Sequence, residues 1–320
     1  MARAFCRSVA AALLLVSAAP ARAGFPDHAV HIVVPYPPGG SVDILGRQVA
    51  QRLSAAWGQG VVVDNRAGAN SVMGSNDVAK APPDGYTLLI NASSLVINRY
   101  LLKTPYDPDT DFAPVALLAK GAMIVAVTPR LPAQNFTELV GLARARPDTL
   151  NFAIGSNGSP GHIATERLMR SAGIRLFIVP YKGSTPAYQD LVAGQISGMV
   201  EPALGIMPFI KSGTIRALAV TSAERIEALP DTPTVAESGV PGFESYSWYG
   251  LWAPGGTPPA LVAALNGEVN GVLRGAELRA QLAAQGFAAQ DGTPADFTTL
   301  LQAESRAVGE IVRAANIKAE

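Results

Sequence analysis

The stretch VHIVVPYPPGGSVDILGRQVAQRL, residues 30–53, decides the fold class of this chain. Its β-branched run at 30–34 predicts a strand, and the Pro- and Gly-rich loop that follows predicts where that strand ends. Leu45, Val49 and Leu53 then recur at the spacing of one face of a helix. A strand, a glycine loop and a helix in succession form the unit from which α/β proteins are built.

The same unit recurs along the chain. Apolar runs predict strands at 61–63, 86–90, 123–127, 150–154, 176–179 and 215–221, and helices are expected at 72–80, 136–144 and 160–172. Strands that alternate with helices indicate crossovers that feed largely parallel sheets. The aromatic run 246–253 is expected to return to the first part of the fold, with Trp248, Tyr249 and Trp252 in the core.

This order predicts two α/β lobes, each a mostly parallel sheet flanked by helices. A length of 320 residues also favours two lobes over one core. We expect lobe 1 to span 24–124 and 247–320, and lobe 2 to span 125–246. Because the chain crosses twice between the lobes, a ligand cleft is expected where they meet.

The composition excludes two classes of protein. Hydrophobic residues make up 48% of the chain and charged residues 16%, which is too apolar for a disordered polymer. The 25 basic residues balance the 25 acidic ones, and no basic block occurs. Nucleic-acid binding needs a clustered positive face, so no nucleic-acid partner is expected.

Residues 1–23 have the order of a secretory signal peptide. Arg3 and Arg7 precede an apolar stretch at 9–19, and the small residues at 21 and 23 suit cleavage before Gly24. The stretch is shorter than the ~20 residues that span a bilayer. The only cysteine, Cys6, would leave with the peptide, so the mature chain would hold no disulfide. We expect a periplasmic protein.

Two Gly/Ser/Pro loops, 34–41 and 154–162, carry most of the functional information. In the first, Gly39 and Gly40 let the backbone approach a ligand closely, and Asp43 falls in the first turn of the next helix. In the second, Ser159 has the chemistry of a helix N-cap and Pro160 suits the first helical position. Two helix N-termini that point free N–H donors into one cleft predict an anion site without any arginine.

From end to end, the mature chain resembles the Bug-type extracytoplasmic solute-binding receptors of the tripartite tricarboxylate transporter family. The motifs that carry the resemblance are VPYPPGG at 34–40, DNRAGA at 64–69, PDGYTLL at 83–89, DFAPV at 111–115, GSPGH at 158–162, VPYKG at 179–183, AGQ at 193–195, RALAV at 216–220 and LPDTPT at 229–234.

The resemblance implies a periplasmic-binding-protein type II fold, a Venus flytrap without a cofactor. It implies a monomer that captures a small organic carboxylate and delivers it to the membrane permease subunits of a transporter. The ligand would be held by loop amides and ordered waters from both lobes. The residues that this resemblance places at the ligand are Tyr36, Gly39, Gly40, Asp43, Ala69, Asn70, Ser93, Ser156, Asn157, Gly158, Ser159, His162, Tyr181 and Glu201.

Two features depart from the family pattern. Asn70 and Ser71 stand where glycine is frequent, and Glu201 stands where many relatives have aspartate. Both are expected to influence which ligand fits, and neither is expected to disturb the fold.

The sequence also bears on a hydrolase, a metal site and a signalling receptor as alternatives. A secreted hydrolase would use Ser156 or Ser159 with His162, but no G-x-S-x-G elbow occurs and the Ser159–His162 spacing suits a cap. No enzyme is therefore expected. A metal site is not expected either, because the mature chain has three scattered histidines and no cysteine. A receptor that presents its ligand to a sensor kinase needs the same flytrap, so this alternative stays open.

Overall fold

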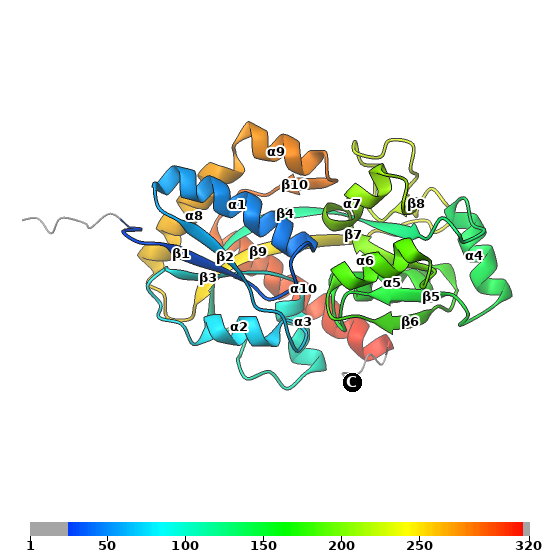
Figure 1. Cartoon of the computed structure of the whole chain (residues 1–320). Coiled ribbons are helices and arrows are strands. Elements are labelled where there is room, and N and C mark those ends of the chain that lie inside the picture. Colours follow the sequence, from blue (N-terminus) through cyan, green and yellow to red (C-terminus); the bar gives the residue numbers. More distant parts are fainter. Residues whose placement is uncertain (1–24, 316–320) are drawn as a thin grey trace, which may run out of the picture.

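The computed structural model describes residues 25–315, so the predicted signal peptide lies outside the described residues. It shows an α/β protein with two lobes (Figure 1). Lobe 1 contains β1 (Val30–Val34), α1 (Ser41–Trp57), β2 (Val61–Asn65), α2 (Val72–Ala79), β3 (Thr87–Ala92), α3 (Ser94–Leu101), β9 (Tyr246–Pro254), α8 (Pro259–Leu273), α9 (Ala276–Ala283), β10 (Phe287–Ala289) and α10 (Pro294–Ala315).

Lobe 2 follows the long strand β4 (Phe112–Val127) in the chain. Its elements are α4 (Phe136–Ala145), β5 (Asn151–Ile154), α5 (Pro160–Ala172), β6 (Phe177–Pro180), α6 (Ser184–Ala193), β7 (Gly198–Pro202), α7 (Ala203–Lys211) and β8 (Arg216–Val220). Figure 1 shows these elements gathered on the right, with β1, β2, β3, α1 and α2 on the left.

The strand β4 belongs to both lobes. Its first part, up to Ala122, pairs with β9 and β10, whereas its last part, from Met123, pairs with β7 and β8. The strand order is β2-β1-β3-β9-β4-β7-β5-β6, with β8 and β10 also on β4. The change of partner lies close to the lobe boundary predicted at 124, which stays a prediction.

The sheets are mixed rather than mostly parallel as predicted. The strands β1, β2 and β3 are parallel to one another, as are β5, β6 and β7. All pairings of β4 and β9 are antiparallel. These two strands carry the chain between the lobes. Parallel pairing would need a helical crossover connection, and antiparallel pairing does not. The predicted return of 246–253 to lobe 1 is confirmed by the pairing of β9 with β3.

The helix α10 packs against both lobes. It contacts α3, α8 and β4 and also reaches α5 of lobe 2. Near its start, Phe297 packs against Trp248 and Trp252, which are buried as predicted. No helix among the described residues is long and apolar enough to cross a membrane.

Candidate functional site

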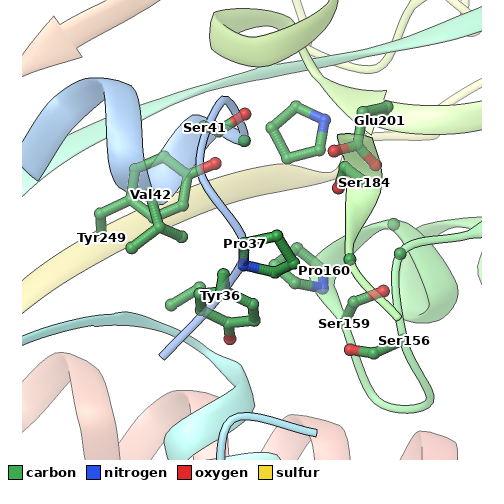
Figure 2. Close-up of a pocket in the computed structure, with 16 residues that line it drawn as sticks. Tyr36, Pro37, Ser41, Val42, Ser156, Ser159, Pro160, Ser184, Glu201 and Tyr249 are labelled. Carbon is green, nitrogen blue, oxygen red and sulfur yellow. The ribbon is translucent and has the colours of Figure 1, made fainter. Parts of the chain in front are cut away.

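Four helices begin around one small cavity between the lobes (Figure 2). The N-cap residues are Gly40 for α1, Ser159 for α5, Gly183 for α6 and Pro202 for α7, and all four line the cavity. We call it the inner cavity. Its volume of about 50 Å³ is enough for a few waters or a carboxylate group.

The start of α5 has the N-cap that its sequence predicts. The Ser159 hydroxyl accepts a hydrogen bond from the His162 N–H at 3.2 Å, and Pro160 occupies the first turn. The N–H groups of a first helical turn have no partner inside the helix, and the helix dipole makes this end positive. Because no Lys, Arg or His is among the described residues that line the inner cavity, its positive potential comes from the backbone.

Two hydroxyl groups in the wall of this cavity have no hydrogen-bond partner. The Ser41 Oγ and the Tyr249 hydroxyl are buried and unpaired among the described residues. In contrast, the Tyr36 hydroxyl donates to Asn91 Oδ1 at 2.8 Å. A buried polar group without a partner is destabilising, so these two hydroxyls are available for polar atoms of a ligand.

Glu201 is the only carboxyl group among the described residues that line the inner cavity. It is 4% exposed, and the Tyr188 hydroxyl donates to its Oε1 at 3.0 Å. Burial raises the pKa of Glu201 to about 7, although the nearby hydroxyls of Ser184 and Tyr188 act to lower it. Figure 2 shows Glu201 and Ser184 on one side of the cavity and Ser41 and Tyr249 on another.

A larger outer cleft of about 860 Å³ adjoins the inner cavity. Both share Tyr36, Pro37, Ser156 and Gly183 in their walls. Lobe 1 adds the turn 67–72, in which Ala69, Asn70 and Ser71 all have left-handed backbone conformations, with φ of 46°, 54° and 71°. The charged residues that line the outer cleft are two exposed lysines, Lys103 and Lys182.

The structure brings nine of the fourteen predicted site residues to these two spaces. The inner cavity is lined by Tyr36, Gly40, Ser156, Ser159 and Glu201, and the outer cleft is lined by Tyr36, Ala69, Asn70, Ser156, Asn157 and Tyr181.

Asp43 lies beside the first loop but lines neither space. It is 3% exposed and accepts hydrogen bonds from the Gly39 N–H at 2.9 Å and from Asn65 Nδ2 at 2.8 Å, and it pairs with Arg47. Burial acts to raise the pKa of Asp43, but the bonds from Arg47, Gly39 and Asn65 outweigh it and lower this pKa. Asp43 therefore fixes the shape of the loop 34–41. Gly39 takes part by donating its backbone N–H to Asp43.

His162 has a comparable role in the second loop. Its Nδ1 accepts a hydrogen bond from the Gly158 N–H at 3.0 Å, and burial lowers the pKa of this imidazole to about 4. A neutral His162 thus holds the loop rather than facing the cavity. Gly158 itself has a φ of 71°, and a Cβ there would lie 2.6 Å from Leu101 Cδ1 of lobe 1. Ser93 directly precedes α3, where its side chain makes no capping hydrogen bond, and it lines a separate cavity beside α10.

Sequence reasoning missed the start of α6 and the hydroxyl of Tyr249 as parts of the site. The segment 181–184 has the same Gly-Ser turn between a strand and a helix as the two recognised loops, so a local signal for α6 was present. The structure places Gly183 N–H against the Gly155 carbonyl at 2.6 Å, which joins the second and third loops. Tyr249 is buried as predicted, but its hydroxyl reaches the inner cavity.

The lobes are in contact on both sides of this site. The Thr185 hydroxyl of α6 donates to the Pro38 carbonyl of lobe 1 at 2.8 Å. In α7, Gly205 lies so close to α1 that a Cβ there would be 2.6 Å from Ser41 Oγ. A ligand in the inner cavity would therefore be enclosed by both lobes.

Residues 45–317 match the family described as the tripartite tricarboxylate transporter family receptor. The chain belongs to this family. It is 36% identical to protein BugT of Bordetella pertussis over 273 residues, 84% of this chain and 82% of BugT. The predicted resemblance to Bug-type receptors is confirmed, and the family is one of periplasmic solute receptors that bind carboxylates.

Solved structures of relatives have the same fold. The R. palustris protein Rpa4515 with adipate has a TM-score of 0.89 and 36% identity, with 92% of this chain and 100% of that chain covered. MatC from Rhodopseudomonas palustris with bound malate has a TM-score of 0.84 and 32% identity, with 90% and 100% covered. The predicted periplasmic-binding-protein fold is confirmed.

Proposed function

We propose that this receptor captures a small organic dicarboxylate between its lobes and delivers it to the permease subunits of a tripartite transporter. The observation that carries this proposal is the meeting of four helix N-termini around a cavity whose described lining has no cationic side chain. Backbone N–H groups and helix dipoles bind an anion without a counter-charge from the protein. Removal of residues 1–23 on export to the periplasm is part of the proposal.

The inner cavity and the outer cleft suggest where the two ends of a dicarboxylate bind. One carboxylate fits the inner cavity, where Ser41, Ser184 and Tyr249 add hydroxyl groups. The rest of the molecule then extends into the outer cleft, where Lys103 and Lys182 provide positive charge for a second carboxylate. The adipate and malate of the two solved relatives are both dicarboxylates, which supports this assignment.

We propose a binding role without catalysis for the serines at the site. A serine hydrolase needs a histidine nitrogen that accepts a proton from the serine hydroxyl. Here Ser159 Oγ accepts from the His162 backbone N–H, and the His162 Nδ1 is occupied by the Gly158 N–H. This arrangement supports a receptor rather than an enzyme.

A thermal-shift panel tests the proposed function. The mature protein is heated with succinate, malate, adipate, citrate and benzoate, and with the neutral diamide of adipate as a matched control. At a concentration 100 times its dissociation constant, a ligand stabilises the folded state by about 2.7 kcal/mol. We expect at least one dicarboxylate to raise the Tm and the diamide to leave it unchanged. No shift with any carboxylate, or an equal shift with the diamide, would contradict the proposal.

A further inference from the structure

Glu201 lies where a bound carboxylate must come close to it. Its Oε1 already accepts from Tyr188, and its Oε2 lies near Gly161, where a Cβ would be 3.3 Å from it. Gly161 is in the first turn of α5, one of the helix starts that form the anion site. In a cavity of about 50 Å³, an anion at these helix starts is therefore a neighbour of the Glu201 carboxyl group.

Two ionised carboxylates repel each other strongly in such a place. Most residues that line the inner cavity are buried, and the described residues that line it include no Lys, Arg or His to separate the charges. Two carboxyl groups that share one site retain a proton between them, because the second ionisation is disfavoured. A protonated carboxyl group then donates a short, charge-assisted hydrogen bond to the ionised one.

We propose that the protein takes up one proton with its carboxylate ligand, and that Glu201 carries this proton and donates it in a hydrogen bond to the ligand. This inference rests on the proposed function and adds the protonation state in which the receptor binds. The proton comes from solvent, and no covalent bond between heavy atoms changes. Glu201 is then a donor that selects for an anionic ligand group, and not an acceptor for a ligand hydroxyl or ammonium.

The groups that surround Glu201 allow this proton uptake near neutral pH. Tyr188 of α6 and Tyr249 of β9 are the ionisable groups that face it, and burial raises the pKa of both, so neither is charged there. The helix α5 contributes Gly161, α6 also contributes the Ser184 hydroxyl, and α1 contributes Ser41, none of which is charged. Because the pKa of Glu201 is about 7 without ligand, the carboxyl group loses its proton as the pH rises through neutrality.

Calorimetric titration of adipate and malate at about pH 6.5 and about pH 8.5 tests the inference. Both ligands are almost fully ionised over this range, so a change in affinity reports on the protein. We expect wild-type affinity to fall roughly twentyfold at the higher pH, because the protonated fraction of Glu201 falls by that factor. Titration in buffers of different ionisation enthalpy at the higher pH should also show uptake of close to one proton.

Glu201→Gln is the decisive variant. Its amide keeps an oxygen for the Tyr188 hydroxyl and places an N–H donor where the protonated oxygen would lie. We expect this variant to bind with the same affinity at both pH values and to take up no proton. Glu166→Gln is the matched control, since Glu166 is also a partly buried carboxyl group of lobe 2 with a raised pKa but lines neither space at the site. It should keep the wild-type pH dependence.

Three results would overturn the inference in distinguishable ways. Equal or tighter wild-type binding at the higher pH, with loss of affinity in Glu201→Gln, would show that an ionised Glu201 accepts a bond from the ligand. Wild-type pH dependence that persists in Glu201→Gln would assign the proton to another group. If no carboxylate of the thermal-shift panel binds at either pH, the proposed function fails as well.

Discussion

At the scale of single residues, the site is defined by polar groups that the fold leaves without partners. The capping serine Ser159 and the buried Asp43 have their hydrogen bonds supplied within the protein. The hydroxyls of Ser41 and Tyr249 do not, although both are buried. Local capping chemistry could be predicted from the sequence, because donor and acceptor lie within a few residues of each other. The role of Tyr249 could not, because its neighbours in the cavity come from distant segments.

Tyr249→Phe tests the role of this hydroxyl. The variant keeps the ring and its stacking on Phe287 and removes only the unpaired oxygen. We expect the affinity for the stabilising dicarboxylate to fall by roughly 10- to 100-fold, because a hydrogen bond to a charged group contributes roughly 1.5–3 kcal/mol. Stability without ligand should be unchanged or slightly higher, since a buried unpaired group is lost.

Tyr106→Phe is the matched control for this experiment. The Tyr106 hydroxyl is also buried and without a partner among the described residues, but it lines neither the inner cavity nor the outer cleft. Its removal should leave the affinity unchanged in calorimetric titration. Equal losses in the two variants would show that the effect of Tyr249 is not specific to the site.

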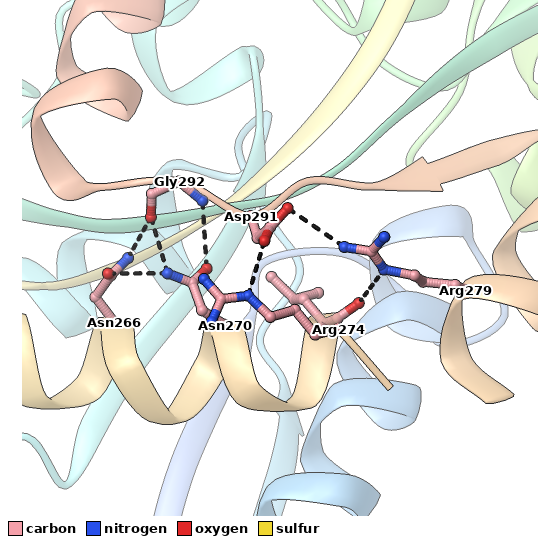
Figure 3. Close-up of polar contacts among 7 residues, drawn as sticks. Asn266, Asn270, Arg274, Arg279, Asp291 and Gly292 are labelled. Carbon is pink, nitrogen blue, oxygen red and sulfur yellow. Dashed lines mark hydrogen bonds and ion pairs between the residues drawn. The ribbon is translucent and has the colours of Figure 1, made fainter. Parts of the chain in front are cut away.

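At the scale of elements, helix starts make the anion site and a polar cluster positions the last helix. The starts of α1 and α5 could be predicted because their Gly and Ser residues follow a clear strand. The starts of α6 and α7 lie at the same point because they follow β6 and β7, which pair in parallel with β5 on either side, and this strand order could not be predicted. On the far side of lobe 1, Asn266 and Asn270 donate to the Gly292 carbonyl at 3.0 and 2.9 Å, and Arg274 binds Asp291 (Figure 3). This cluster fastens α8 to the segment that leads into α10.

Asn270→Ala should therefore lower stability without affecting the site. Its loss leaves the partly buried Gly292 N–H without its acceptor and the Gly292 carbonyl with Asn266 as its only side-chain donor, so we expect the free energy of unfolding to fall by about 1–3 kcal/mol in denaturant titration. Gly267→Ala on the same helix is the control, because a Cβ there meets nothing within 4 Å. It should stabilise by up to about 1 kcal/mol. A loss of ligand affinity in Asn270→Ala would show that this cluster is coupled to the cleft.

At the scale of the whole molecule, two lobes share one long strand and enclose the site between them. The two α/β lobes could be predicted from the alternation of apolar runs and glycine loops. The antiparallel pairings of β4 and β9 could not, because strand direction depends on partners far apart in the sequence. The contacts of Thr185 with Pro38 and of Gly205 with α1 hold the lobes together around the inner cavity. Ligand binding should favour this closed arrangement of the lobes. A ligand that contacts both lobes binds the closed arrangement more tightly than an arrangement in which the lobes are apart.

The most direct measurement is a crystal structure of the mature protein with the dicarboxylate that stabilises it most. We expect one ligand carboxylate in the inner cavity, with its oxygens about 3 Å from backbone nitrogens at the starts of α1, α5 and α6. The second carboxylate should lie in the outer cleft on the side of Lys103 and Lys182. A ligand bound only by these lysines, with the inner cavity holding nothing but water, would contradict the claim that helix N-termini bind the anion.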